Sequence, residues 1–277
     1  MDIQEPPIRR EEILLLKDDV FHGGHVCIVT GAGSGIGRAA AVVAAANGLH
    51  VAAVDIHAAG CAETARIAGT LGGRVTPIQA DLTNDRDLER AVEQSADLGK
   101  IKFLANIAGV QHIDSVENFP MEKYDFMQKL MLRAPFYLSK LAIPEMKRND
   151  GGAIGNMGSV HAHICTVNKP VYSMTKFGLR ALTQSIAAEG EGRIRSFSVS
   201  VGFVRTPLAL GQIPAQAKQR GLSEEAVVRD VMMGRSRVKE MMRPVEVGNL
   251  FVFGFSRFAR YLVGGDLLFD GGMVLTY

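Results

Sequence analysis

The sequence predicts an α/β fold, a doubly wound parallel sheet of seven strands with helices on both faces. Two observations lead to this prediction. Short apolar, β-branched runs of strand length alternate with longer helical patterns from residue 25 onward, and a glycine-rich turn joins the first run to the first helix. Because each helix returns the chain to the same edge of the sheet by a right-handed crossover, the strands are expected to be parallel, with a ligand crevice beyond their carboxyl ends.

Seven segments have the pattern of buried strands, and long helical patterns lie between several of them. The strands are expected at residues 25–30, 49–54, 74–80, 101–105, 153–157, 195–201 and in a last short segment that leads to Phe269. The helices are expected at residues 38–46, 87–96, 121–146, 171–189 and 245–255. In the helix at residues 121–146, we expect Pro135 to interrupt the helix and Pro144 to end it, because proline lacks the backbone N–H of a helix interior.

Two segments lie outside this alternation. Residues 1–22 form a charged leader, which we interpret as an N-terminal extension. Residues 207–243 are helical and polar without a clear strand, and their position after a strand end indicates a lid that closes on substrate. No linker, repeat or low-complexity segment interrupts residues 23–277, so we predict a single domain there.

Composition and charge exclude several classes of protein. A formal net charge of +2 gives no electrostatic case for nucleic-acid binding. The leader lacks the apolar stretch of a signal peptide, and the longest run of small apolar residues, 39–46, falls well short of the ~18 residues that span a membrane. The three cysteines have no C-x-x-C spacing and the seven histidines form no H-E-x-x-H pattern. We therefore expect a cytoplasmic protein without a metal.

The glycine-rich turn at residues 31–37 reads Gly-Ala-Gly-Ser-Gly-Ile-Gly. Glycines permit a tight turn and let the backbone approach a pyrophosphate, which binds over the positive end of the following helix. About twenty residues later the second strand ends in Asp55, where a carboxylate can bind the adenosine ribose hydroxyls. That carboxylate repels a 2′-phosphate, and neither Ser34 nor Ile56 offers a cation for one, so NAD is favoured over NADP.

Two further polar residues, Asp81 and Asn106, stand at the ends of the third and fourth strands. The carboxyl ends of parallel strands meet at one edge of the sheet, so both side chains are candidates for the same crevice. For Asp81 a cap on the following helix is an equally good interpretation.

Tyr172 and Lys176 lie four residues apart in a helical segment and therefore share one helix face. A phenol, whose ordinary pKa is about 10, acts as an acid or base near neutral pH when a nearby positive charge favours its phenolate. Lys176 can supply that charge, and Ser159, on an upstream segment, can hydrogen-bond the oxygen whose proton Tyr172 takes. Taken alone, the spacing is equally typical of a solvated surface stripe.

The joint pattern from about residue 24 onward resembles the short-chain dehydrogenase/reductase family, which has a Rossmann fold. Its motifs are Thr30-Gly-x-x-x-Gly-x-Gly, Asp55, Asp81-Leu82, Asn106-x-Ala-Gly, Ser159 and Tyr172-x-x-x-Lys176. The resemblance implies that Tyr172 is the general acid/base, that Lys176 lowers the pKa of Tyr172 and binds the nicotinamide ribose, and that Ser159 orients the substrate. It also implies NAD-binding roles for Gly31, Ser34, Gly35, Ile36, Gly37, Asp55, Asp81, Leu82, Asn106, Tyr172, Lys176, Val204 and Thr206.

A narrower resemblance is to the D-3-hydroxybutyrate dehydrogenases of that family. Residues 108–112, Ala-Gly-Val-Gln-His, and 159–161, Ser-Val-His, together with Asn168-Lys169, match their pattern. The resemblance implies a short 3-hydroxy acid or its 3-keto acid as substrate, bound by Gln111, His161, Lys169 and Gln212. Lys169 offers a charge for the substrate carboxylate, and the other three offer hydrogen bonds. A homotetramer is also implied.

The chain departs from the family pattern at Met131, where such enzymes carry an asparagine that holds a proton-relay water, and at Val201, where a proline is common. A methionine cannot hydrogen-bond such a water usefully. Three alternatives stay open. The protein is a dehydrogenase of another secondary alcohol, a dehydrogenase of a 3-hydroxyacyl thioester, or a weakly active or non-catalytic NAD-binding subunit that accompanies a paralogous subunit. In the second, phosphates of coenzyme A would meet the basic lid residues Lys218, Arg220, Arg229, Arg235, Arg237 and Lys239.

Overall fold

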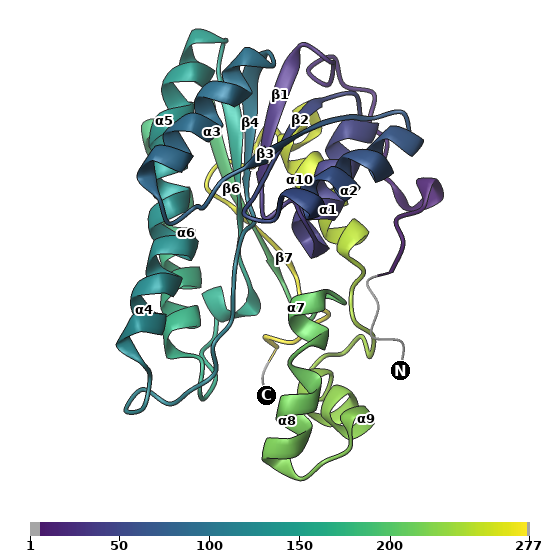
Figure 1. Cartoon of the computed structure of the whole chain (residues 1–277), viewed down its shortest axis with the longest axis vertical. Helices are drawn as coiled ribbons and strands as arrows, with labels where there is room; N and C mark the ends of the chain where they lie inside the picture. The colour runs from purple at the N-terminus through teal and green to yellow at the C-terminus, as the bar shows by residue number, and fades with distance from the viewer. Residues whose placement is uncertain (1–5, 276–277) are drawn as a thin grey trace.

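Seven parallel strands form one sheet in the order β3-β2-β1-β4-β5-β6-β7 (Figure 1). The computed structural model describes residues 6–275, apart from the side chains of residues 215 and 219. The strands are β1 His25–Thr30, β2 His50–Asp55, β3 Arg74–Gln79, β4 Lys100–Asn106, β5 Gly152–Met157, β6 Ile194–Val201 and β7 Asp266–Phe269. The predicted doubly wound parallel sheet is therefore confirmed.

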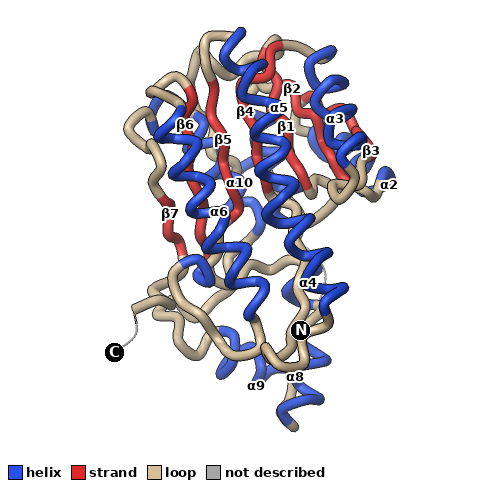
Figure 2. Tube along the Cα trace, turned by 90° about the vertical axis from the view of Figure 1, so that its left-hand side faces the viewer, coloured by secondary structure: helices blue, strands red, loops and turns tan. Residues whose placement is uncertain are grey.

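Helices cover both faces of the sheet. The helices are α1 Gly35–Ala46, α2 Ala58–Thr70, α3 Asp85–Asp97, α4 Met121–Gln128, α5 Ala134–Arg148, α6 Pro170–Glu189, α7 Pro207–Leu210, α8 Ile213–Arg220, α9 Glu224–Ala226 and α10 Pro244–Phe255. Helices α3, α5 and α6 lie on one face, and α1, α2 and α10 lie on the other (Figure 2). Alternate residues of β1 enter the two cores, with Cys27 in one and Ile28 in the other, as the period of two along a strand requires.

The order of the strands reverses at β1. Its neighbours are β2 on one side and β4 on the other, so the chain winds outward in both directions from this point. The connections that leave β1 and β4 diverge to opposite faces of the sheet, which opens a crevice beyond their carboxyl ends.

The long helix after β4 differs from the prediction in two respects. At Pro135 the helix does not break, because a π-helical segment, Lys129–Arg133, joins α4 to α5 and accommodates the missing backbone N–H. The prediction that the helix ends near Pro144 was wrong, since α5 continues through this residue to Arg148. The carbonyl that loses its donor there belongs to Lys140, which is exposed, so water can hydrogen-bond it.

The described part of the leader packs against the main body of the protein. Ile13 and Phe21 are buried in the core that α1 and α10 also form. The amide oxygen of Asn249, on α10, accepts the backbone N–H of Leu14 at 2.9 Å, and that of Asn47, after α1, accepts the N–H of Leu16 at 2.8 Å. The leader therefore packs against both α1 and α10.

The segment at residues 207–243 lies beyond the carboxyl ends of the strands, as α7, α8 and α9 show in Figure 1. It has a small apolar core of its own, which includes Leu210, Ile213, Val227 and Met232. A single parallel bridge between residues 204 and 242 joins its two ends. Among the helices of residues 6–275, none is long and apolar enough to cross a membrane.

Candidate active site

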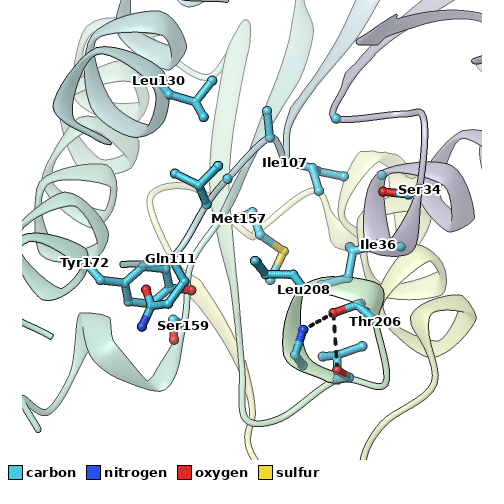
Figure 3. Close-up of a pocket in the computed structure, with 18 of the residues that line it drawn as sticks. Ser34, Ile36, Ile107, Gln111, Leu130, Met157, Ser159, Tyr172, Thr206 and Leu208 are labelled. Carbon is cyan, nitrogen blue, oxygen red and sulfur yellow. Dashed lines mark hydrogen bonds between the residues drawn. The ribbon is translucent and has the colours of Figure 1, made fainter. Parts of the chain in front are cut away.

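A cavity of about 530 Å³ opens at the carboxyl ends of the strands. Figure 3 shows Ser34 and Ile36 on one side of it, and Tyr172, Ser159 and Gln111 on the other. All but one of the residues predicted for the site line this cavity: Gly31, Ser34, Gly35, Ile36, Gly37, Asp55, Asp81, Leu82, Gln111, Ser159, His161, Lys169, Tyr172, Lys176, Val204, Thr206 and Gln212. The exception is Asn106.

The glycine turn forms one wall from backbone atoms. Gly31 and Gly35 adopt φ angles of +68° and +55°, which favour glycine. A Cβ on Gly37 would lie 2.0 Å from the carbonyl oxygen of Gly31, so no side chain fits there. The N-cap residue Ser34 makes no side-chain bond to the first turn of α1. The unpaired N–H groups and the helix dipole are thus available to an anion such as a pyrophosphate.

Asp55 is held rigidly at the end of β2. One carboxylate oxygen accepts the backbone N–H of Gly33 at 3.0 Å, and the other accepts that of His57 at 2.9 Å. These bonds fix the carboxylate beside the glycine turn, where a ribose hydroxyl can reach it. Arg38, on α1, directs its guanidinium to the carbonyl of Gly33 and to the hydroxyl of Thr64.

The two strand-end residues behave differently. The Oδ1 of Asp81 accepts both the backbone N–H and the hydroxyl of Thr83 at 2.8 Å, and it does not cap α3, because the side chain of Asn84 does. Asn106 is buried below the wall of the cavity, and its amide donates to Oδ1 of Asn156 at 2.9 Å. Its Oδ1 has no partner in the described part of the chain. Asn106 thus joins β4 to β5.

Tyr172 and Lys176 share the face of α6 that borders the cavity, as their spacing predicts. The ammonium of Lys176 lies 5.3 Å from the centre of the Tyr172 ring and donates to the carbonyl of Met157 at 2.7 Å. Burial lowers the pKa of Lys176 to about 8. Burial also raises the pKa of the Tyr172 phenol, and a hydrogen bond with Ser159 opposes that rise. Desolvation is therefore the main influence on the pKa of this phenol, and the lowering that we expected from Lys176 is not among its causes.

Ser159 and His161 form a hydrogen-bonded pair in a short 3-10 turn, Val160–Ala162. The Oγ of Ser159 accepts the backbone N–H of His161 at 3.2 Å and lies 3.3 Å from its Nδ1. The Nε2 of His161 lies 2.9 Å from the hydroxyl of Thr166. Both ring nitrogens thus have protein partners, and a substrate that binds His161 as predicted would have to displace one of them. Thr166 was not predicted, because it stands in a loop without any periodic signal.

The imidazole of His161 is packed and uncharged. Its ring lies edge-on to that of Tyr172, with the ring centres 5.5 Å apart. Burial, with smaller contributions from the charges of Lys169 and Lys176, lowers the pKa of His161 to about 4. The ring is therefore neutral at pH 7, with one nitrogen that donates and one that accepts.

Two polar groups on the wall make no hydrogen bond or ion pair with residues that the structure describes. Lys169 lies with its ammonium 5.8 Å from the centre of the Phe203 ring, burial lowers its pKa, and none of the described carboxylates lies within ion-pair distance of it. The amide oxygen of Gln111 is buried, with no hydrogen bond from any described residue. Gln212, by contrast, donates to the carbonyl of Leu208 at 2.9 Å.

Met131 supports the loop that follows β4. It is fully buried in the π-helical segment, and its sulfur lies 3.4 Å from the backbone nitrogen of Val110, whose N–H it accepts. A Cβ on Gly109 would lie 3.4 Å from the same sulfur. Met131 thus packs against the backbone between the strand end and Gln111.

A glycine turn at a helix N-terminus, an acid at the next strand end and a tyrosine–lysine pair in one crevice define an NAD(P)-dependent oxidoreductase. The family model described as "Enoyl-(Acyl carrier protein) reductase" matches residues 31–274. The chain belongs to the short-chain dehydrogenase/reductase family.

Relatives in this family are similar over nearly their whole length. The D-beta-hydroxybutyrate dehydrogenase of Cupriavidus necator is 31% identical over 91% of this chain and 98% of its own, and that of Rhizobium meliloti is 32% identical over 88% and 96%. A short-chain type dehydrogenase/reductase from Mycobacterium marinum superposes with a TM-score of 0.83 at 26% identity, over 93% of this chain and 99% of that one. A candidate NAD(P)-dependent gluconate 5-dehydrogenase from Beutenbergia cavernae, solved with bound NADP, superposes with a TM-score of 0.82 at 26% identity over 93% and 100%.

Proposed function

We propose that this protein is an NAD-dependent dehydrogenase that interconverts a short 3-hydroxy acid and its 3-keto acid. The observation that supports this most is the ammonium of Lys169, which stands without a carboxylate partner among the described residues on the wall that also presents Tyr172. A substrate carboxylate would supply the missing partner through a charge-assisted hydrogen bond. The unpaired amide of Gln111 favours a polar substrate too. The name of the two relatives agrees with this assignment.

The walls of the cavity fit a nicotinamide dinucleotide. The backbone of residues 31–37 would hold the pyrophosphate and Asp55 the adenosine ribose, while the bound cofactor supplies the acceptor or donor of hydride. We infer NAD rather than NADP, because the negative charge of Asp55 repels a 2′-phosphate.

The chain's own contribution to the reaction is the proton. Tyr172 would exchange a proton with the substrate oxygen, and Ser159 would orient that oxygen through its hydroxyl. Because burial raises the pKa of Tyr172, the phenol of the free enzyme is protonated at neutral pH, which is the form that can protonate a keto acid. Lys176, buried beside the ring, would favour the phenolate in the opposite direction.

The deciding experiment is an assay of the purified protein with NAD and D-3-hydroxybutyrate, followed by the absorbance of NADH. We expect turnover of the acid and little turnover of its neutral methyl ester. Replacing Lys169 by Ala should raise the KM for the acid at least about tenfold and leave that for the ester unchanged, because a charge-assisted hydrogen bond contributes about 1.5–3 kcal/mol. Lys218→Ala, at an exposed position of the lid, is the matched control.

The thioester alternative and the non-catalytic alternative have their own outcomes when the assay is repeated with further hydroxy compounds. Turnover of a 3-hydroxyacyl thioester but of no free acid would indicate that the protein is a 3-hydroxyacyl thioester dehydrogenase. Tight binding of NAD without turnover of any hydroxy compound would favour a non-catalytic subunit. An unchanged KM in Lys169→Ala would contradict carboxylate recognition by this residue.

We also infer that the chain self-associates through the face formed by α4, α5 and α6 (Figure 2). Large apolar side chains are exposed on these helices, namely Met121, Phe126, Phe136, Met174 and Phe177. Exposed apolar side chains on neighbouring helices are typical of a protein–protein interface. Light scattering of the wild type and of Phe136→Glu would test the expected tetramer.

A cytoplasmic location remains a prediction.

A further inference from the structure

A line of hydrogen-bonding groups leads from the phenol of Tyr172 to the surface. Ser159 borders the same cavity as the Tyr172 phenol (Figure 3), and its Oγ lies 3.3 Å from Nδ1 of His161. On the other side of the ring, Nε2 lies 2.9 Å from the hydroxyl of Thr166. Ser159 and His161 are buried, whereas Thr166 is exposed to solvent. One end of this line is therefore buried at the phenol, and the other end, Thr166, is exposed to solvent in the loop.

The other groups around the phenol are poorly placed to conduct a proton. Met131 offers a sulfur that is a weak acceptor and cannot donate, and this sulfur already accepts the N–H of Val110. The ammonium of Lys176 is directed to the carbonyl of Met157. Oxidation of an alcohol nevertheless leaves one proton on Tyr172 in every turnover, and that proton has to reach solvent before the next.

We propose that Ser159, His161 and Thr166 form the proton path between Tyr172 and solvent, which rests on the catalytic role proposed for Tyr172. In the oxidative direction the phenol O–H passes its proton to Ser159, whose own hydroxyl proton passes to Nδ1 of His161. The proton on Nε2 passes to Thr166, and the hydroxyl proton of Thr166 passes to water. One proton enters and one leaves, and the imidazole keeps its charge but changes tautomer. The ring must then rotate about its Cβ–Cγ bond to restore the first tautomer before the next oxidation. Reduction of a keto acid uses the path in reverse.

The chemistry of each member fits this role. Ser159 has one donor and two acceptor positions, which match the imidazole, the phenol and the backbone N–H of His161. A neutral imidazole accepts at one nitrogen and donates from the other, whereas a charged ring can only donate. The charged and titratable groups that face the ring are Lys169, Lys176 and Tyr172, and the two ammonium groups disfavour a charged imidazole.

The exposed end of the path permits a test that leaves the core intact. In Thr166→Val we expect kcat of the NAD-loaded enzyme to fall at least about tenfold, since general acid–base catalysis contributes about 10²–10⁴. KM and the affinity for NAD should not change, the solvent isotope effect on kcat should increase, and added imidazole should restore turnover. Thr166→Ser should keep the wild-type kcat. Val167→Ala, at the next exposed position, is the control for disturbance of the loop.

Two kinetic results would overturn the path. One is an unchanged kcat and isotope effect in Thr166→Val. The other is a rise of KM alone, which would make His161 and Thr166 substrate-recognition residues instead.

A measurement without substrate separates this proposal from the proposed function. Nuclear magnetic resonance of nitrogen-labelled histidine, with the His161 signal assigned from His161→Gln, reports the charge and tautomer of the ring. We expect a neutral ring at pH 7 whose tautomer balance shifts in Thr166→Val and in Ser159→Ala. A charged ring, or a signal that neither variant moves, contradicts the path even in an active enzyme. If the wild type oxidises no hydroxy acid, the proposed function fails, and the resonance result still decides whether the path exists.

Discussion

The two walls of the crevice present different chemical groups to a ligand. On the dinucleotide side, the glycine turn and the first turn of α1 present backbone groups, and an added Cβ at Gly37 would overlap a carbonyl oxygen. On the substrate side, α6 and the 3-10 turn present side chains, among them Tyr172, His161 and Lys169. The glycine turn of the first wall leaves no room for a side chain at Gly37, whereas the function of the second wall depends on side chains.

This difference teaches where each kind of specificity resides. A wall of backbone atoms recognises a phosphate that all dinucleotides share, so its geometry leaves little room for variation. A wall of side chains can be changed residue by residue, and burial there shifts the pKa values of Tyr172, His161 and Lys176. Substitutions on the two walls should therefore fail in different ways, by loss of binding on one and by loss of chemistry on the other.

The largest effect is expected at Gly37. Its replacement by Ala places a Cβ 2.0 Å from the Gly31 oxygen, so the turn must open, and we expect binding of NAD to be lost or the protein to unfold. Gly69→Ala, on α2, has no atom within 4 Å of the new Cβ and should retain NAD binding, with a gain in stability of up to ~1 kcal/mol. Thermal unfolding and calorimetric titration with NAD would compare the two. Normal NAD binding by Gly37→Ala would contradict the expectation that substitutions in the glycine turn act by loss of binding.

The next largest effect is expected at Tyr172. Tyr172→Phe keeps the ring but removes the proton donor, so kcat should fall by about 10³-fold while the affinity for NAD stays nearly intact. Steady-state turnover and the same titration measure both quantities. Full residual activity would remove Tyr172 from its proposed role.

Lys176 provides a pH-dependent test. Its folded-state pKa of about 8 lies below the ordinary value of 10.5, so between these values the unfolded chain holds a proton that the folded protein lacks. The free energy of unfolding should therefore rise as the pH increases from 8 to 10.5, by ~3 kcal/mol at most. In Lys176→Met this rise should disappear, which urea denaturation at several pH values would show. Parallel pH profiles of the two proteins would contradict the buried ammonium.

The smallest effect is expected at Asp55, whose carboxylate we propose to bind the adenosine ribose. Asp55→Ser removes the negative charge and should weaken NAD binding about tenfold, because a hydrogen bond to a charged group contributes about 1.5–3 kcal/mol. The affinity for NADP should improve relative to NAD. Wild-type protein that binds NADP more tightly than NAD would contradict the assigned preference.

The sequence predicted the backbone wall better than the side-chain wall. Glycine spacing and strand ends are local signals, so the turn, Asp55 and the position of Asp81 follow directly from the order of residues. Asn106 also stands at a strand end, but successive side chains alternate between the faces of a strand, and this one pairs with Asn156 of β5. The spacing of residues in the sequence does not show whether Asn106 points to the cavity or to Asn156.

On the substrate side, the pKa shifts and hydrogen-bond partners depend on tertiary packing, which the residue types alone do not reveal. The spacing of Tyr172 and Lys176 predicts a shared helix face, but the desolvation that raises one pKa and lowers the other depends on the elements packed around them. The partners of His161 depend on how the loop folds back after the 3-10 turn, which brings Thr166 to the ring. Pro144 lies within α5, where its missing N–H leaves the carbonyl of the exposed residue Lys140 without an intrahelical donor.

The π-helical segment Lys129–Arg133 places one residue more between α4 and α5 than a regular α-helix would. A π turn closes its hydrogen bond over one residue more than an α turn, so it amounts to an inserted residue within the long helix. Deleting one residue there would let the segment relax to an α-helix and leave the phase of α5 relative to α4 nearly unchanged, because the π turn takes up the extra residue. Met131 reaches the loop after β4 from inside this turn, so its role depends on a backbone insertion as well as on the identity of its side chain.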